Sequence, residues 1–215
     1  MDKPLLCPAG LEDLVDAFDL DDATAALIAA YDSHLLEVSA HTNLLARSSL
    51  ADRWARHYAD SLQLARFIPD HASSYLDLGS GAGFPGLLLA IVHRHRPCRV
   101  TLCDSVGKKA RFLKETAEAL GLDITVEARR AEALAAAGDR FEVITARAVT
   151  ALDKLLGLCA PLLPKDGILI APKGERAEKE RDEAEKRWTF SADLHASQTH
   201  PGARIFVIRQ VRPRP

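Results

Sequence analysis

The stretch DLGSGAGFPG, residues 77–86, decides the fold of this 215-residue chain. It lies between the apolar run SYLDLG (74–79) and the apolar segment PGLLLAIVHRHR (85–96), and its glycines alternate with small residues. A glycine-rich loop between a strand and the next helix lets a ligand approach backbone N–H groups and the helix N-terminus closely. The stretch therefore predicts the ligand-binding loop of an α/β sheet.

Strand-like and helix-like segments alternate from residue 74 onward. This order predicts an α/β fold with a doubly wound, mostly parallel sheet of seven strands, the last two forming an antiparallel hairpin. The strands are expected at 74–79, 99–104, 124–129, 141–149, 167–174, 190–197 and 203–211. The helices are expected at 85–96, 106–122, 131–138, 151–163 and 175–188.

The first 70 residues show helical spacing instead of this alternation. Residues 22–40 and 50–68 carry the spacing, with Asp21 and Ser49 as expected caps. We expect a helical extension over 1–70 that packs on a Rossmann-like core over 71–215, the two forming one domain because the extension is too small for its own core.

Composition narrows the class of protein. The net charge is −2. The sequence has no run of about 18 apolar residues, which is the length that would predict a membrane span. The acidic N-terminus lacks the features of a secretory signal. Four scattered cysteines without a CxxC pair predict reduced thiols in a cytosolic protein, with neither a disulfide framework nor a zinc site.

Two ligand patterns fit the glycine loop. Gly81, Gly83 and Gly86 spell GxGxxG, the pattern of dinucleotide-binding dehydrogenases. Asp77, Gly79, Gly81 and Gly83 spell DxGxGxG, which is typical of S-adenosylmethionine-dependent methyltransferases. The second reading is favoured because the strand already ends at Gly79, before the first glycine of the dinucleotide pattern.

Three further residues are candidates for the same cofactor. The next strand ends at Asp104, whose carboxylate can accept both ribose hydroxyls of either cofactor. Ala131 and Glu132 follow the third strand and can read the adenine edge through backbone N–H and carboxylate. The alternative for Glu132 is an acidic residue that stabilises the first turn of a helix.

The loop after the fourth strand, TARAVTAL (145–152), should lie at the reacting end of the cofactor. It has no Asn-Pro-Pro-aromatic motif of amino-group methyltransferases, no cysteine nucleophile of the kind that pyrimidine C5 methylation needs, and no cluster of acids for a metal. These absences favour a target atom that is already nucleophilic. Arg147 is the unusual residue of this loop, and an ion pair is the alternative role for it.

Six segments together resemble the bacterial 16S rRNA guanine-N7 methyltransferase family, also called glucose-inhibited division protein B. The resemblance covers roughly residues 40–175. The segments are RHYADSL (56–62), DLGSGAGFPG (77–86), DSVGKKARFLKE (104–115), RRAEAL (129–134), ARAVTALDKLL (146–156) and PKG (172–174).

The resemblance implies a class I methyltransferase that moves a methyl group from S-adenosylmethionine to N7 of guanine 527 in the 530 loop of 16S rRNA. It implies cofactor contacts from Gly79, Phe84, Ala131, Glu132 and Arg147. Gly81 and Asp104 are added from the glycine pattern and the general layout of such enzymes.

Guanine N7 has a free lone pair and no proton, so we expect Arg147 to act by positioning, without a general base and without a metal. The basic residues Arg53, Arg56, His57 and Lys173 are expected to contact RNA phosphates. The expected partner is 16S rRNA or the small ribosomal subunit, bound by a monomer.

Three other functions fit parts of the sequence. A small-molecule methyltransferase would need no basic residues outside the cleft. A non-catalytic regulator would bind S-adenosylmethionine or RNA without turnover, and a dehydrogenase would bind NAD instead.

Overall fold

The structure, a computed structural model, describes residues 5–215 and contains one seven-stranded sheet in the order β3-β2-β1-β4-β5-β7-β6. Strands β1 to β5 pair in parallel, and β7 pairs antiparallel with both β5 and β6. The predicted α/β fold with its terminal hairpin is confirmed. The strands are β1 (Ser74–Leu78), β2 (Arg99–Cys103), β3 (Ile124–Glu127), β4 (Val143–Thr145), β5 (Ile168–Lys173), β6 (Trp188–Ala196) and β7 (Arg204–Pro213).

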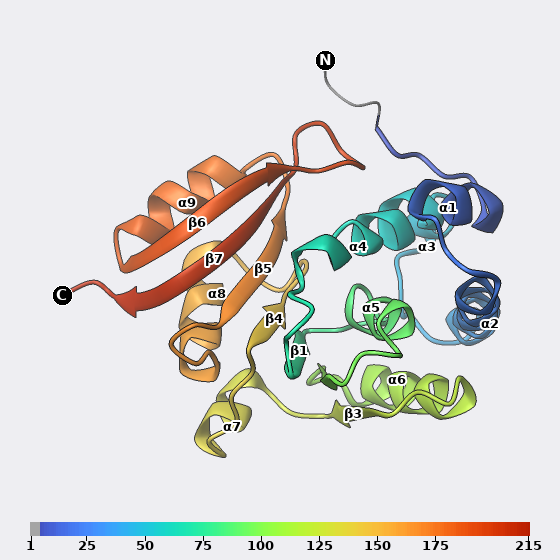
Figure 1. Ribbon diagram of the computed structural model, residues 1–215, viewed down its shortest axis with the longest axis horizontal. Helices are drawn as coiled ribbons and strands as arrows, with labels where there is room; N and C mark the ends of the chain where they lie inside the picture. Colours follow the sequence, from blue (N-terminus) through green and yellow to red (C-terminus); the bar gives the residue numbers. More distant parts are fainter. Residues whose placement is uncertain (1–4) are drawn as a thin grey trace.

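Helices cover both faces of the sheet (Figure 1). Helices α7, α8 and α9 pack on one face, where Leu134, Leu155 and Ala184 belong to one buried apolar cluster. Helices α5 and α6 cover the other face together with the N-terminal helices. The bounds are α5 (Gly86–Val92), α6 (Gly107–Ala119), α7 (Ala131–Ala136), α8 (Leu152–Cys159), the 3-10 turn η3 (Ala160–Leu162) and α9 (Ala177–Glu185).

The N-terminal helices pack on the face of the sheet that α5 and α6 cover, and they have more breaks than the sequence indicates. Asp21 caps α2 as expected, since its side chain accepts a hydrogen bond from the Thr24 N–H at 2.6 Å. Ser49 is not a cap, because α3 begins after Ala46 and the Ser49 hydroxyl donates back to the Ala46 carbonyl at 2.8 Å. The elements are α1 (Leu11–Phe18), α2 (Asp22–Ser39), α3 (Arg47–Leu50), the π-helical segment η1 (Trp54–Ala59), α4 (Asp60–Leu62) and the 3-10 turn η2 (Ala65–Phe67).

The helical layer lies directly on the glycine loop. The buried Tyr31 hydroxyl of α2 donates to the Ala82 carbonyl at 2.5 Å. Ile28 and Tyr31 share an apolar cluster with Phe84 and Leu87 from the loop and α5. One core therefore serves both the extension and this face of the sheet.

A buried carboxylate closes the glycine loop from below. Asp77 is fully buried at the end of β1, where it accepts the Gly86 N–H at 3.0 Å and the Thr145 hydroxyl at 2.6 Å. Burial raises the pKa of Asp77 to about 6 because it disfavours the charged form. Above it the backbone turns through Gly81 at φ +60° and Gly83 at φ +105°, conformations that glycine adopts at little cost.

Two glycines that each open a helix should differ in their response to alanine. A Cβ on Gly86 would meet the Asp77 side chain and, at 2.5 Å, Leu102 Cδ2, whereas a Cβ on Gly107 would meet nothing within 4 Å. Gly86→Ala should lower the free energy of unfolding by about 1–3 kcal/mol through overpacking. Gly107→Ala should leave it within about 1 kcal/mol. Urea unfolding measures both, and equal stability of the two variants would contradict the tight packing beneath the loop.

Candidate active site

A cleft of about 310 Å³ opens at the carboxyl ends of the parallel strands, beside the glycine loop. It brings together Gly79, Asp104, Ala131 and Glu132, all of which the sequence predicts as cofactor contacts. Apolar side chains form part of its wall and basic side chains lie on its rim. These additional lining residues are Leu78, Cys103, Val149 and Leu158, and Lys109, Arg129 and Arg130.

Volume alone does not identify this cleft as the site. A larger hollow of about 1020 Å³ lies at the opposite edge of the sheet, against the amino ends of β2 and β3. It includes Arg99 and Ile124 but none of the glycine loop. In an open parallel sheet, ligands bind outside the carboxyl ends of the strands, so the smaller cleft is the better candidate.

Asp104 joins β2 to the glycine loop. One carboxylate oxygen accepts the Gly81 N–H at 2.9 Å, and the other accepts the Val106 N–H at 2.8 Å. The residue is only 7% exposed. Each carboxylate oxygen has a second lone pair, so Asp104 can still accept hydroxyl groups from a ligand in the cleft.

The glycine loop and the loop after β4 touch at Gly79. A Cβ there would lie 2.6 Å from Val149 Cγ2, and the Gly79 φ of +74° also favours glycine. Ala148, next to Val149, has a φ of 57°, which is uncommon for a residue with a side chain. The two loops are therefore fixed against each other at the wall of the cleft.

Phe84 lies behind the cleft. Its side chain is 3% exposed and packs among the rings of Tyr31, Tyr58 and His57, with centroids 5.4, 4.9 and 5.3 Å away. It is not among the residues that line the cleft. The structure therefore does not bring Phe84 to the surface of the cleft, and its cofactor contact stays a prediction.

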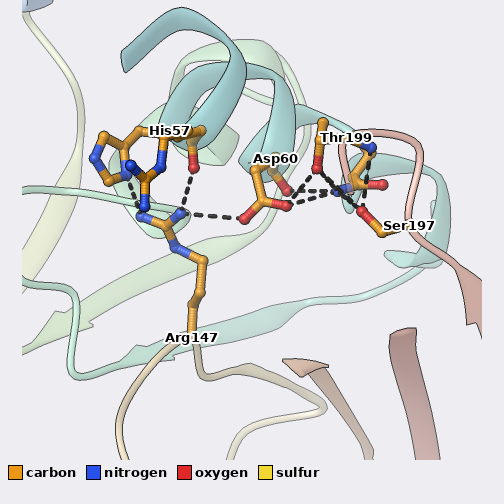
Figure 2. A network of polar contacts seen from close by, with 7 residues as sticks. His57, Asp60, Arg147, Ser197 and Thr199 are labelled. Carbon is orange, nitrogen blue, oxygen red and sulfur yellow. Dashed lines mark hydrogen bonds and ion pairs between the residues drawn. The ribbon is translucent and has the colours of Figure 1, made fainter. Parts of the chain in front are cut away.

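Arg147 points from the β4 loop into the helical layer (Figure 2). Its Nη1 donates to the Arg56 carbonyl at 3.0 Å and to Asp60 Oδ2 at 3.1 Å, and its Nη2 lies 3.2 Å from His57 Nδ1. The guanidinium also lies 5.7 Å from the centre of the Phe84 ring. Arg147 thus connects the predicted transfer loop to η1 and α4.

The sequence profile of the family described as rRNA small subunit methyltransferase G matches residues 24–206. This chain belongs to that family. It is 40% identical over 202 residues to the ribosomal RNA small subunit methyltransferase G of Rhodospirillum centenum, covering 94% of this chain and 91% of that protein. It is 42% identical over 183 residues to the enzyme of the same name from Methylorubrum extorquens, covering 85% and 86%.

Solved structures of other methyltransferases share the fold. An O-methyltransferase from Bacillus cereus, solved with SAH, superposes with a TM-score of 0.59 at 15% identity over 92% of this chain and 96% of that one. A methyltransferase from Geobacter sulfurreducens superposes with a TM-score of 0.57 at 15% identity, covering 95% and 98%. At such identities the likeness concerns the fold alone.

Two of the basic residues expected to bind RNA have other partners in this member of the methyltransferase family. Arg53 forms a two-point ion pair with Asp32 at 2.6 and 2.8 Å, and its guanidinium lies over the Trp54 ring. This pair holds α2 against η1. In the free protein Arg53 is thus engaged within the helical layer, and its contact with RNA phosphate stays a prediction.

Lys173 is half-buried, and its side chain is only 9% exposed. Its Nζ donates to the Thr150 carbonyl at 2.5 Å and pairs with Glu180 at 3.0 Å. Glu180 in turn accepts the Leu152 N–H at the start of α8. Lys173 therefore fixes the far end of the β4 loop in the free protein, and its contact with phosphate stays a prediction.

The remaining two basic residues differ from each other. Arg56 is exposed, and its contact with RNA stays a prediction. Burial, aided by Arg147 and Arg56, lowers the pKa of His57 to about 4, so its ring is neutral at physiological pH. Because Nδ1 faces the Arg147 donor, the ring proton lies on Nε2, and His57 cannot pair with a phosphate as a cation.

Asp60 and Glu180 are site residues that the sequence analysis missed. Asp60 stands within RHYADSL, but no local pattern shows that its partner is Arg147. Glu180 lies in a mixed-charge helix whose pattern favours a solvated surface. Each of the two contacts a partner that is distant in sequence, and residue spacing does not reveal such pairs.

Residues 5–215 contain no group of three or more His, Cys, Asp or Glu side chains placed to hold a metal ion. Among the described helices, none has both the length and the apolar character needed to cross a membrane.

His57 should make folding sensitive to acid. The unfolded chain takes up a proton near pH 6.5 and folded His57 only near pH 4, so stability falls as pH drops through this range. Between pH 7 and 5 the wild type should lose about 1 kcal/mol more than His57→Asn, after allowance for partial solvent access. Urea unfolding of both proteins at each pH gives the difference. The pKa of His93 is also lowered, but His93 is present in both proteins, so its contribution cancels. Parallel pH curves would contradict the buried neutral ring.

Proposed function

We propose that this chain transfers the methyl group of S-adenosylmethionine to N7 of a guanine in 16S rRNA, by resemblance guanine 527 of the 530 loop. The observation that carries the proposal is the contact between the cleft and the Arg147 loop at Gly79. The chain belongs to an rRNA methyltransferase family. In it, this contact places a cleft large enough for a ligand beside a loop that contains no acidic side chain and no thiol.

The residues of the cleft fit S-adenosylmethionine. Asp104 would accept the ribose hydroxyls through its remaining lone pairs, and Glu132, exposed at the start of α7, would face the adenine with Ala131. Leu158 and Val149 offer apolar surface for a flat ring. The positive φ of Gly79, which lines the cleft, lets its backbone approach the ligand closely, whereas Gly81 does not line the cleft and donates its N–H to Asp104.

S-adenosylmethionine, when bound, supplies an electrophilic methyl group on a sulfonium. The protein then has to align guanine N7 with that methyl group and exclude water, because N7 already offers a lone pair. Arg147 is the residue proposed to position the reactants. Its five N–H donors are held in a rigid plane, which suits the orientation of a purine edge or a carboxylate.

The nearby titratable groups are poor general bases. His57 has its Nδ1 lone pair directed at Arg147 and a pKa of about 4. Asp60 is paired with Arg147. Asp77 is fully buried beneath the loop and bonded to Gly86 and Thr145. These environments support a reaction that needs no deprotonation of the target atom.

The RNA surface proposed here differs from that expected from the sequence. Arg56 is exposed beside Arg147, and Lys109 and Arg130 lie on the rim of the cleft, so these cations can hold phosphates around an extruded guanine. We also propose that the chain acts as a monomer. The exposed large apolar side chains of residues 5–215 come from four separate segments, namely Leu5, Leu36, Val106 and Val149.

Product identity tests the proposed function. Small-subunit particles that lack the modification are incubated with the protein and labelled S-adenosylmethionine, and the labelled nucleoside is identified by mass spectrometry and mapped by chemical cleavage. We expect N7-methylguanine in 16S rRNA. A methyl group on an exocyclic amine, a ribose oxygen or a pyrimidine carbon would refute the proposal.

Asp104→Asn should weaken binding of S-adenosylmethionine. The amide loses the charge and offers one acceptor oxygen where the carboxylate offers two, which should cost about 1.5–3 kcal/mol, or roughly 10- to 100-fold in affinity. Asp123→Asn makes the same change in an exposed residue at the opposite edge of the sheet and serves as the control. Calorimetry measures both. Wild-type affinity in a folded Asp104→Asn protein would show that the ribose does not bind to Asp104.

The rate of methyl transfer should depend little on pH and strongly on Arg147. Because the pKa of His57 is about 4, the single-turnover rate should be nearly flat from about pH 6.5 to 8.5. Arg147→Ala should lower that rate, and Arg147→Lys should restore it only in part, because a point charge cannot replace a planar fork. A rate that rises across this pH range, or full activity of Arg147→Lys, would argue against positioning by the guanidinium.

A further inference from the structure

Asp60 lies at the centre of a polar network that joins three distant parts of the chain (Figure 2). Its Oδ2 accepts from Arg147 Nη1 at 3.1 Å. Its Oδ1 accepts from Gln63 Nε2 at 2.9 Å and from the Thr199 hydroxyl at 2.8 Å. The two oxygens of one carboxylate therefore face different partners, one in the β4 loop and the others in α4's C-cap and the β6–β7 turn.

The network is shielded from solvent. The side chains of Arg147 and Asp60 are 16% and 21% exposed, so their ion pair is screened less than one on the open surface. Around it, the hydrogen bonds to Arg56 and His57 fix the guanidinium plane, and Phe84 lies beneath it. An arginine in this setting has one preferred orientation.

That orientation leaves part of the guanidinium available. The hydrogen bonds of Arg147 with the described residues use both Nη1 hydrogens and one Nη2 hydrogen. Of its five donors, the Nε–H and the second Nη2–H make no hydrogen bond within residues 5–215. The ion pair with Asp60 thus holds the side chain without using all of its donors.

The β6–β7 turn supports Asp60 from the far side. The Thr199 hydroxyl contacts Asp60 directly and also lies 3.0 Å from the Ser197 hydroxyl. Gln63 donates to Ser197 at 3.2 Å and accepts the Gln198 N–H at 2.8 Å. These bonds tie the turn to α4's C-terminal end and leave Asp60 little room to move.

We propose that Asp60 is a positioning residue for methyl transfer, which fixes Arg147 for its role and is itself held by Thr199 of the β6–β7 turn. The inference rests on the proposed function, because it assigns Arg147 to the transfer step. It adds a second requirement, namely a carboxylate with two oxygens at residue 60. An asparagine there has one acceptor oxygen, so its NH₂ group would face either Arg147 or the donors of Gln63 and Thr199.

The first test compares Asp60→Asn with the wild type in single-turnover methyl transfer to small-subunit particles. The rate should fall about tenfold or more, while the KM for particles changes less than about threefold, because the reacting geometry is lost and the RNA surface is kept. Asp193→Asn breaks an exposed ion pair with Arg209 in the hairpin by the same chemical change and should keep the wild-type rate. A wild-type rate for folded Asp60→Asn would overturn the proposal.

A double-mutant cycle separates positioning from general stability. If Asp60 acts through Arg147, Asp60→Asn should lower the rate no further once Arg147→Ala is present. Independent, multiplying losses from the two substitutions would overturn the proposal. Urea unfolding of the four proteins gives the coupling of the pair in the folded state, and the absence of any coupling would count against the contact itself.

A matched pair at Thr199 tests the support from the turn. Thr199→Val removes the hydroxyl that donates a hydrogen bond to Asp60 and should lower the rate about threefold or more. Thr199→Ser keeps the hydroxyl and should keep most of the rate. Equal rates for the two variants would overturn the role of the turn. Failure of the wild type to make N7-methylguanine would instead refute the proposed function, so the two failures can be told apart.

Discussion

The buried carboxylate of Asp77 is the group on which the ligand-binding end of the sheet depends. It sits where β1 ends and receives the Gly86 N–H at the start of α5 and the Thr145 hydroxyl at the end of β4. Thr145 shares a second hydrogen bond, 2.6 Å long, with the Tyr75 hydroxyl. Loss of the carboxylate would leave buried donors unpaired. The free-energy cost of an unpaired buried donor exceeds the net stabilisation that its hydrogen bond provides. One side chain therefore connects β1, β4 and the start of α5, the elements that surround the glycine loop.

The glycine loop then organises the elements around it. Tyr31 binds the Ala82 carbonyl from the helical layer, and a Cβ on Gly83 would lie 2.6 Å from the Tyr31 hydroxyl. On the other side, Gly79 lets Val149 of the β4 loop come close. The helical layer is consequently a structural part of the site. Arg147 bonds to η1 and α4 in that layer, which links the sheet and the extension a second time.

Much of the fold follows from sequence because its signals are local. The alternation of apolar runs predicts the strands and helices, the glycine pattern predicts the loop, and Asp21 predicts a helix cap that the structure confirms. Four of the cofactor candidates, Gly79, Asp104, Ala131 and Glu132, meet in one cleft because they all follow parallel strands. The helix at Leu11–Phe18 and the π-helical segment were not anticipated.

The contacts that sequence could not supply are those of charged side chains whose partners are distant in sequence. Arg53 pairs with Asp32, 21 residues earlier, and Arg147 pairs with Asp60, 87 residues earlier. A basic residue near a site fits both a phosphate contact and a structural ion pair, and only its burial and partner distinguish the two roles. The same reason explains Lys173, whose position at the end of β5 was predicted correctly and whose partner was not.

The contacts of Asp77 imply that the glycine loop is formed before any ligand binds. Amide hydrogen exchange of Gly86 in the protein without cofactor measures this, because its N–H is the one that Asp77 accepts. We expect exchange nearly as slow as global unfolding allows, with little change when S-adenosylhomocysteine is added. Exchange as fast as in an unstructured peptide, with protection only after the ligand is added, would contradict it.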